Sequence, residues 1–329
     1  MLKVTPTAAP HYSLAHQQHR YSRLLGSLEV EHADRQGPVL RDLELRMTAN
    51  PAVFEPHVWR IAELGPGAIV QLRDGQPEPG LEFLEALGDE QQLRLRFELR
   101  HEGREAAAAT AEALLLPKDH WAGARGMPEL LASFVQPHAE LVERLVKRAA
   151  GLLRETPGGY ALDGYQSGDR RAPWMTAQAL WHAVAELGLD YVAPPPDFAR
   201  TGQRIRLPER VASSGAAACL DASVLFAACL EAAGLHPVVA LTDGHACAGC
   251  WLVEDSFPLL ANEDPMDMRK RVDGQDIVLF ETTLALRPPV PSFAAACAAA
   301  EPLLAEAAEA AFVLALDVKQ ARERGVRPL

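Results

Sequence analysis

The sequence lacks any uninterrupted apolar run of the roughly twenty residues that a bilayer-spanning helix needs, although 48% of its 329 residues are hydrophobic. Its first residues, MLKVTPTAAPHYSLAHQQHRYSR, also lack the apolar central segment of a secretory signal peptide. These absences argue against a membrane span and against secretion. We therefore expect a cytoplasmic protein with an ordinary hydrophobic core and no membrane partner.

Positive charge and paired cysteines are scarce. The net charge of −12 argues against non-specific binding of nucleic acid by the chain as a whole. Short basic runs at residues 269–271 and 322–327 are expected to be solvated, and DNA binding through them is the weaker alternative. The five cysteines all lie in the C-terminal half without the spacing of a disulfide framework, which predicts free thiols in a reducing compartment.

Residues 25–118 alternate apolar and polar side chains with the period of two that is typical of β-strands. Strands are predicted over residues 28–32, 40–49, 57–64, 68–72, 81–87, 91–101 and 107–116, with turn-rich segments between them. Short strands at this spacing predict a small antiparallel β-sandwich of immunoglobulin-like type, preceded by an extension over residues 1–24.

From residue 119 the apolar residues recur at helical steps of three and four. Residues 119–197 are predicted to be a helical connecting region that ends in the extended linker YVAPPPDF. Residues 198–290 combine a helix with strands, and residues 291–329 are predicted to form one or two long helices divided near Pro302. The predicted fold class is α+β.

Cys219 has the most informative surroundings in the chain. It lies in SSGAAACLDASVLFAACLEAAGL, where Ser213 and Ser214 are candidate N-caps and the later residues are apolar nearly all round, as in a central buried helix. In the first turn of that helix, a cysteine would lie near the positive end of the helix dipole, which favours the thiolate. Taken alone, Cys219 is better explained as a small core residue.

Two later residues raise the interest of Cys219. His245 opens the predicted strand GHACAGCWL, and Glu281 lies in the next one, DIVLFETTL. A histidine near the sulfur can serve as a general base, and a carboxylate bonded to its other ring nitrogen would orient it. The alternatives are a structural histidine and a Glu281 that caps a turn or reaches solvent. Gln203 is a candidate oxyanion donor, because an amide side chain can donate to a developing oxyanion.

Other residues have simpler explanations. Asp221 is expected to complement the N-terminus of the cysteine helix. Cys247 and Cys250 form a CxxC, but on a strand this spacing points the side chains to opposite faces. Tyr165 and Gln166 are weaker candidates to line the site. We expect no metal and no cofactor.

The stretch GAAACLDASVLFAACLEAAGLHPVVAL, followed by GHACAGCWL and VLFETT, resembles the core of the transglutaminase-like superfamily of papain-type thiol enzymes. The resemblance implies a transglutaminase-like (papain-like) α+β core over residues 198–290, with Cys219 as nucleophile, His245 as general base and Glu281 as orienting acid. The chain departs from the superfamily pattern by having Glu281 where Asp is usual and Thr282 where Pro is common.

The sequence is similar to one bacterial group in particular, whose members join an immunoglobulin-like N-terminal domain to this core, often ahead of a superfamily 1 helicase and nuclease region. MTANPAVFEPHVWRI, LDGYQSGDR, GQRIRLPERV and ARERGVRPL carry the similarity. It implies a protein or peptide substrate, a helicase or nuclease partner or fused domain, and a role in anti-phage defence. The chain has no GxxxxGK[ST] phosphate loop, so we expect a stand-alone relative or a piece of a longer protein.

The leading hypothesis is a cysteine protease that hydrolyses peptide or isopeptide bonds. The same thiol chemistry can transfer the acyl group to an amine, as in a transglutaminase. A hypothesis of a different class is an inactive interaction or regulatory module. Convergence of Cys219, His245 and Glu281 in the fold would favour the enzyme.

Overall fold

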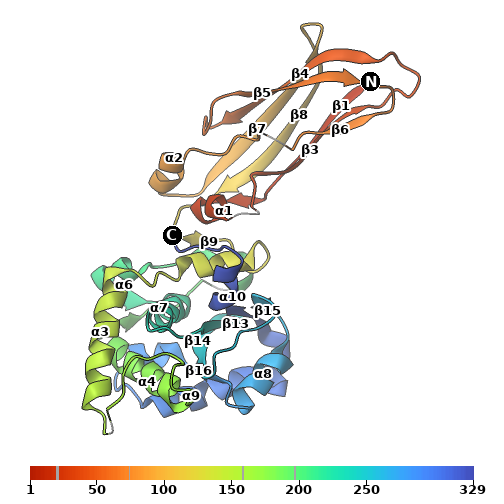
Figure 1. Cartoon of the computed structure of the whole chain (residues 1–329). Coiled ribbons are helices and arrows are strands. Elements are labelled where there is room, and N and C mark those ends of the chain that lie inside the picture. Colours follow the sequence, from red (N-terminus) through yellow and green to blue (C-terminus); the bar gives the residue numbers. More distant parts are fainter. Residues whose placement is uncertain (20–21, 74, 158, 196–197) are drawn as a thin grey trace. The chain divides into compact units, whose positions relative to one another are not determined.

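The computed structural model describes residues 1–19, 22–73, 75–157, 159–195 and 198–329. Its contacts divide the chain into two compact units, Met1–Lys118 and Asp119–Leu329. The first consists mainly of strands and the second mixes helices with strands, so the fold is α+β, as the sequence predicts (Figure 1). No helix within these described ranges is both long and apolar enough to cross a bilayer.

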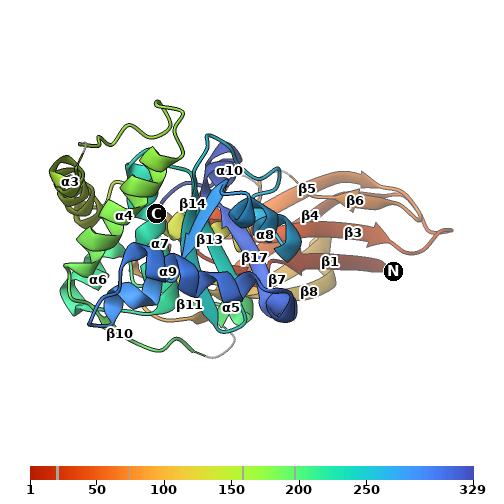
Figure 2. The same ribbon diagram turned by 90° about the horizontal axis from the view of Figure 1, so that it is seen from below.

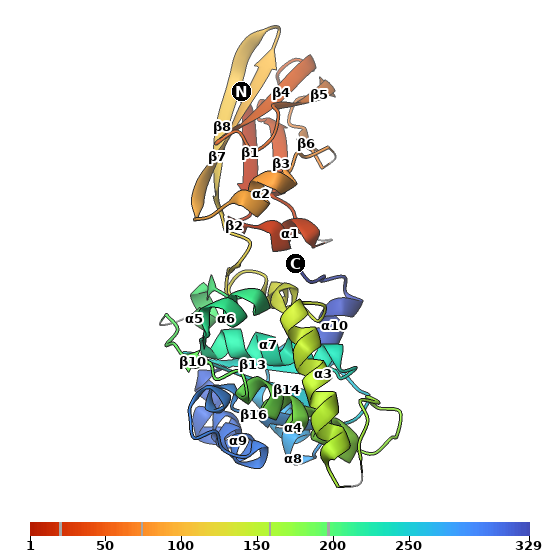
Figure 3. The same cartoon turned by 90° about the vertical axis from the view of Figure 1, so that its left-hand side faces the viewer.

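The unit Met1–Lys118 contains two sheets, with strand orders β1-β3-β6 and β2-β8-β7-β4-β5. The strands are β1 (Leu2–Ala8), β2 (His11–Tyr12), β3 (Leu25–His32), β4 (Leu40–Asn50), β5 (His57–Leu64), β6 (Ile69–Gln71), β7 (Gln91–His101) and β8 (Arg104–Leu115). Neighbouring strands are antiparallel, except that β2 runs parallel to β8. β1 of the smaller sheet contacts β8 of the larger one (Figure 3).

The alternation in β7 shows why these segments form strands. Leu93, Leu95, Phe97 and Leu99 are fully buried, while the side chains between them are exposed or half-buried. Because successive side chains point to opposite faces of a strand, one face of β7 is buried and the other is exposed to solvent. The sequence pattern over residues 91–101 predicts this arrangement.

Two segments of this unit differ from the sequence prediction. Residues 1–24, expected to be an extension, contribute β1, which pairs with β3 along its whole length. Residues 81–87, predicted to be a strand, form helix α2 (Leu81–Ala86) instead. Leu84 is the one fully buried residue of this helix. The alternating apolar residues of this segment therefore do not pack against a sheet, and the segment forms a short helix instead.

The centre of the unit Asp119–Leu329 is an antiparallel sheet of order β15-β17-β13-β14-β16. Its strands are β13 (Pro237–Thr242), β14 (His245–Trp251), β15 (Ala261–Asn262), β16 (Ile277–Phe280) and β17 (Phe312–Asp317). Helix α7 (Cys219–Ala232) packs against β13 and β14. Helix α8 (Pro265–Asp273) and the 3₁₀ helix η3 (Glu301–Leu304) cover the other face (Figure 2).

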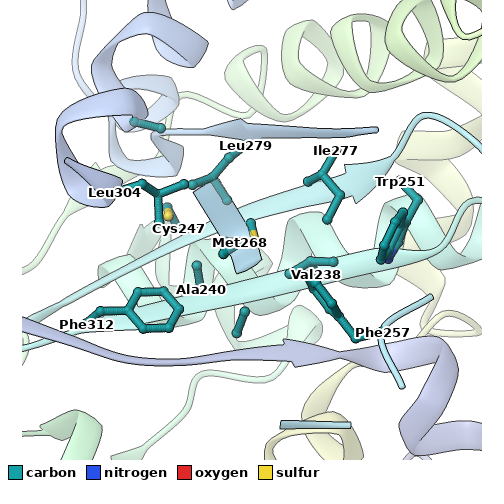
Figure 4. Packing of buried hydrophobic residues seen from close by; sticks show 12 residues of the cluster. Val238, Ala240, Cys247, Trp251, Phe257, Met268, Ile277, Leu279, Leu304 and Phe312 are labelled. Atoms are coloured by element: carbon teal, nitrogen blue, oxygen red, sulfur yellow. The ribbon is translucent and has the colours of Figure 1, made fainter. Parts of the chain in front are cut away.

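Figure 4 shows the sheet face opposite α7, where alternate residues of the strands meet in one apolar cluster. The cluster contains Val238, Ala240, Cys247, Trp251, Ile277, Leu279, Phe312 and Ala315 from the strands, with Phe257, Met268, Ala300 and Leu304 from the segments above them. The intervening strand residues therefore face α7.

Helix α7 is enclosed on all sides. Helices α3 (Glu140–Glu155) and α4 (Arg171–Ala185) contact it in addition to the sheet, and every residue from Cys219 to Leu230 is buried. The prediction of a central buried helix is therefore confirmed. Within the predicted helical region 119–197, residues Pro128–Phe134 form the 3₁₀ helix η1. Residues 196 and 197 of the predicted linker lie outside the described ranges.

Strand β17 corrects the prediction that residues 291–329 form one or two long helices divided near Pro302. Helix α9 (Phe293–Ala300), η3 and the 3₁₀ helix η4 (Glu306–Ala311) come before it, and helix α10 (Val318–Glu323) follows. The run FVLALD pairs with both β13 and β15. Sequence periodicity cannot distinguish a buried strand from a buried helix in so short an apolar run. Here the run forms a strand because its backbone pairs with strands on both sides.

Candidate active site

Cys219 is the first residue of α7, as the sequence predicts, but the helix begins differently from the prediction. Ser213 and Ser214 belong to the preceding helix α6 (Pro208–Ser214), which ends at Gly215 in the left-handed conformation. The short strand β12 (Ala216–Ala217) follows, and Ala218 is the N-cap of α7. The two serines therefore do not cap the cysteine helix, because the glycine between them and Cys219 terminates one helix before the next begins.

Asp221 supplies the cap that the serines do not. Its side chain is fully buried; Oδ2 accepts from the backbone N–H of Ala218 at 2.8 Å and from Arg206 Nη1 at 2.9 Å. Oδ1 accepts from the backbone N–H of Arg206 at 2.8 Å. A carboxylate in the first turn complements the helix dipole, and here it also fastens the incoming segment to the start of α7.

His245 is the first residue of β14 and lies opposite Thr242 of β13. The turn between the strands contains Gly244, whose positive φ of 74° favours a residue without a side chain. Cys219, the first residue of α7, is one of the groups that raise the pKa of this imidazole.

Glu281 follows β16 directly and is the N-cap of the 3₁₀ helix η2 (Thr282–Leu286). Its Oε2 lies 2.5 Å from Nε2 of His245. Its Oε1 accepts from the backbone N–H of Thr283 at 3.0 Å and from Thr283 Oγ1 at 2.7 Å. The carboxylate thus caps a turn and binds the histidine at once, which combines two of the alternatives that the sequence leaves open.

The structure brings the three side chains into mutual influence. Glu281 is bonded to Nε2 of the His245 ring, and Cys219 acts on the same ring electrostatically. Beneath them, Ser223 Oγ donates to the carbonyl of Cys219 at 2.8 Å and lies 3.1 Å from Thr282 Oγ1. A hydroxyl at position 282 therefore links η2 to α7, which gives a structural reason for threonine here.

These contacts account for the pKa values of His245 and Glu281. Burial alone would lower the pKa of His245, but its hydrogen bonds to Cys219 and Glu281 and their negative charges raise it to about 9. Burial alone would raise the pKa of Glu281, but the bonds from His245 and Thr283 and the imidazolium charge lower it below its ordinary value. At neutral pH the pair is an imidazolium and a carboxylate.

Gln203 lies in the two-residue strand β11 (Gln203–Arg204), opposite Trp121 of β9 (His120–Trp121). Its side chain is buried, and neither Gln203 Nε2 nor Trp121 Nε1 has a hydrogen-bond acceptor among the described residues. A buried donor without a partner is costly, and a ligand oxygen is one way to satisfy it. Arg206, three residues after Gln203 in the sequence, binds Asp221 in the first turn of α7.

The other cysteines differ from Cys219 in their surroundings. Burial raises the pKa of the Cys229, Cys247 and Cys250 thiols above the ordinary value, and that of the half-buried Cys297 to about 12. Among the described cysteines, Cys219 is the one that contributes to the raised pKa of His245. In the part of the chain that the structure describes, no group of three or more His, Cys, Asp or Glu is arranged to hold a metal ion.

Two weaker sequence candidates lie elsewhere. Tyr165 accepts from the backbone N–H of His236 at 2.8 Å and donates to the carbonyl of Trp251 at 2.9 Å. With Gln166, it lines a polar cavity of about 460 Å³ near the C-terminal end of α7. Cys219 begins that helix, so this cavity is at the opposite end from the sulfur.

Three arginines of the basic runs form ion pairs. Arg269 binds Glu309, and Arg271 lies 3.3 Å from Asp276. Arg322 forms a two-pronged pair with Glu231 at 2.8 and 2.9 Å. These contacts hold segments of the fold together.

Sequence reasoning missed two residues beside the site, Tyr191 and Arg287. The Tyr191 hydroxyl interacts electrostatically with Cys219 and Glu281, and the Arg287 guanidinium carbon is 4.3 Å from the centre of the Tyr191 ring. Neither residue lies in a motif. The one available signal was the position of Arg287, six residues after Glu281.

Comparisons with known proteins add little. No protein-family model matches the chain, and no curated protein matches it. A crystal structure of a "putative protease" from Parabacteroides distasonis is similar over 65% of this chain and 41% of that one, with 12% sequence identity and a TM-score of 0.24. A score this low supports no conclusion about fold or function, and this chain matches less than half of that protein.

Proposed function

We propose that this protein is a cysteine hydrolase that cleaves peptide or isopeptide bonds through Cys219, His245 and Glu281. The observation that carries the proposal is the hydrogen bond between His245 and Glu281, next to a cysteine at the start of α7 that acts on the same imidazole. These groups come from a helix start, a strand start and a strand end that are far apart in sequence. A nucleophile, a base and an orienting acid in this order define the general arrangement of a thiol hydrolase.

The mechanism begins from an ion pair. An imidazolium next to sulfur stabilises the thiolate, and the N-terminus of α7 adds its dipole. The Cys219 thiolate attacks the scissile carbonyl, and His245 gives its proton to the departing amine, which leaves an acyl-enzyme thioester. Neutral His245 then takes a proton from water, whose oxygen attacks the thioester and releases the acid and the thiolate.

Two donors are suited to the oxyanion that forms in both steps. The backbone N–H of Cys219 is in the first turn of α7 and has no partner within the helix. The second donor in this proposal is Nε2 of Gln203, which has no acceptor of its own in the described ranges. Glu281 holds the ring in place and stabilises its positive charge, since both carboxylate oxygens are engaged.

The wider assignment rests on the sequence resemblance. We propose that the unit Met1–Lys118 is an immunoglobulin-like sandwich and that the second unit contains a transglutaminase-like core. The two-sheet architecture of the first unit supports the former, and the order of Cys219, His245 and Glu281 supports the latter. A helicase or nuclease partner and a role in bacterial defence belong to the same proposal.

One observation favours the alternative, an inactive interaction module. Cys219 has no exposed surface in this structure. An enzyme must open a path to this sulfur, whereas a module need not. Labelling of the thiol in the folded protein therefore separates the two.

The test compares wild type with Cys219→Ala and, as a matched control, Cys297→Ala. Folded protein is treated with an alkyne-tagged iodoacetamide, and candidate protein substrates are incubated with each variant and analysed by mass spectrometry. We expect label on Cys219 and substrate cleavage in wild type and Cys297→Ala, with cleavage lost in Cys219→Ala. Cross-linked products with an added amine would indicate acyl transfer. Cleavage that persists in Cys219→Ala, or a folded protein whose Cys219 takes no label, contradicts the proposal.

A further inference from the structure

Tyr191 is fixed beside the start of α7 by backbone pairing. It lies in strand β10 (Asp190–Tyr191), which runs parallel to β12 with Tyr191 opposite Ala217, two residues before Cys219. The backbone N–H of Asp190 donates to Gly215 at 2.8 Å, and that of Val192 donates to Ala217 at 3.0 Å. The backbone of Tyr191 is therefore fixed beside the segment that leads into Cys219.

The electrostatic surroundings of the Tyr191 ring include groups of the site. Burial raises the pKa of Tyr191, the negative charge of Cys219 raises it further, and the positive charge of Arg287 lowers it. Glu281 also contributes. Tyr191 thus has both proposed anionic groups of the site within electrostatic range.

Arg287 adds a positive charge at the same place. It caps the C-terminal end of η2, the short helix that Glu281 begins, and its guanidinium carbon is 4.3 Å from the centre of the Tyr191 ring. The side chain is exposed, and in the part of the chain that the structure describes it forms no ion pair with a carboxylate. The aromatic ring fixes the guanidinium without neutralising its charge.

We propose that Arg287, held over Tyr191, is a specificity residue that binds a carboxylate of the substrate, so that the enzyme prefers acidic peptides. This inference rests on the proposed thiol hydrolase function. A guanidinium binds a carboxylate through two parallel hydrogen bonds, and an arginine with no acidic neighbour keeps that capacity for a ligand. Its neighbour is the ring of Tyr191, whose strand pairs with the segment that leads into Cys219, so an acidic side chain near the scissile bond is the partner that fits.

The test uses Cys219 itself as the reporter and needs no known substrate. Iodoacetate and iodoacetamide alkylate a thiolate by the same displacement of iodide, but only iodoacetate is anionic. The rate ratio of the two reagents at Cys219 is measured at one pH by mass spectrometry, with Cys297 as an internal control. Wild type is compared with Arg287→Gln, with Arg287→Lys, and with Arg154→Gln, which changes the net charge equally at an exposed helix position.

We expect the ratio of iodoacetate to iodoacetamide rates at Cys219 to fall about three- to tenfold in Arg287→Gln. It should recover in part in Arg287→Lys and stay unchanged in Arg154→Gln and at Cys297. A Glu-rich peptide should slow labelling of Cys219 in wild type but not in Arg287→Gln, and a Lys-rich peptide should slow neither.

The two proposals fail in different ways. An unchanged ratio in Arg287→Gln, or equal protection by the two peptides, overturns the role of Arg287 and leaves the thiol hydrolase standing. If neither reagent labels Cys219 in the folded protein while Cys297 reacts, the hydrolase proposal fails and the specificity proposal fails with it.

Discussion

Nε2 of His245 lies 2.5 Å from Oε2 of Glu281, and the other oxygen of the same carboxylate is held by Thr283. One carboxylate thus connects the imidazole to the backbone of η2. The ring orientation and the charge on the ring consequently depend on the same residue.

Replacing Glu281 with Gln should shift the alkaline limit of activity. Without the carboxylate charge, the pKa of His245 falls from about 9, so the proton that the leaving amine needs is lost at a lower pH. The alkaline limb of kcat/KM should move to lower pH, and kcat should fall about a hundredfold. Glu281→Asp should retain the limb in part, and Glu140→Gln should match wild type. An unmoved limb in Glu281→Gln would show that the carboxylate does not set the imidazole charge.

Replacing Asp221 with Ala should destabilise the second unit. The change removes a fully buried carboxylate that binds Ala218 and Arg206. We expect the free energy of unfolding to fall by about 3 kcal/mol, measured by urea denaturation. Glu140→Ala, which removes an exposed pair with Arg144, should cost less than about 0.5 kcal/mol. Equal losses in the two variants would contradict the role of Asp221.

Gly249 should tolerate no side chain. A Cβ at this position in β14 would lie 2.3 Å from the carbonyl oxygen of Val278 in β16. Because backbone rather than a flexible side chain occupies the space, Gly249→Ala should destabilise the sheet by about 3 kcal/mol or more. Gly65→Ala, whose Cβ would meet nothing within 4 Å, serves as the control. Thermal unfolding of both variants checks this, and a normal Tm for Gly249→Ala would mean that β14 and β16 can separate locally.

The first unit should lose stability in acid through His16. Burial and the nearby charges of His11 and His19 lower the pKa of His16 to about 4, from an ordinary value near 6.5. The unfolded chain binds this proton more readily than the folded chain. The contribution of neutral His16 to the free energy of unfolding is therefore fully present above pH 6.5 and is lost as the pH falls from 6.5 through about 4. The loss amounts to about 3 kcal/mol.

His16→Gln removes the titrating group while keeping an acceptor for Ser13, which lies 2.8 Å from His16 Nδ1. Hydrogen exchange of β7 and β8 peptides at pH 7 and pH 4.5 should show a smaller acid-induced loss of protection in this variant. If wild type and variant lose protection equally, His16 does not account for the acid sensitivity.

The sequence predicts those parts of the fold that depend on local pattern. The apolar stretch from Cys219 to Leu230 predicts α7, and the alternation over residues 91–101 predicts β7. Non-local pairing accounts for the errors. The run FVLALD becomes a strand because β13 and β15 lie on either side of it.

The candidate site divides in the same way. The order of cysteine, histidine and carboxylate along the chain predicts three of its members. Tyr191 and Arg287 could not be predicted, because they meet only after β10 pairs with a strand twenty-six positions further along the chain. The sequence also predicts that Asp221 complements the start of α7, and its bond to the backbone of Ala218 agrees with this.

The position of β17 decides where this chain can be cut. It lies between β13 and β15, although almost seventy residues separate it from the end of β13. A truncation at residue 290 would keep the cysteine, the histidine and the glutamate but leave one side of β13 with bare amide and carbonyl groups. Such an edge recruits strands from other molecules, so the shortened protein would precipitate for reasons unrelated to its chemistry.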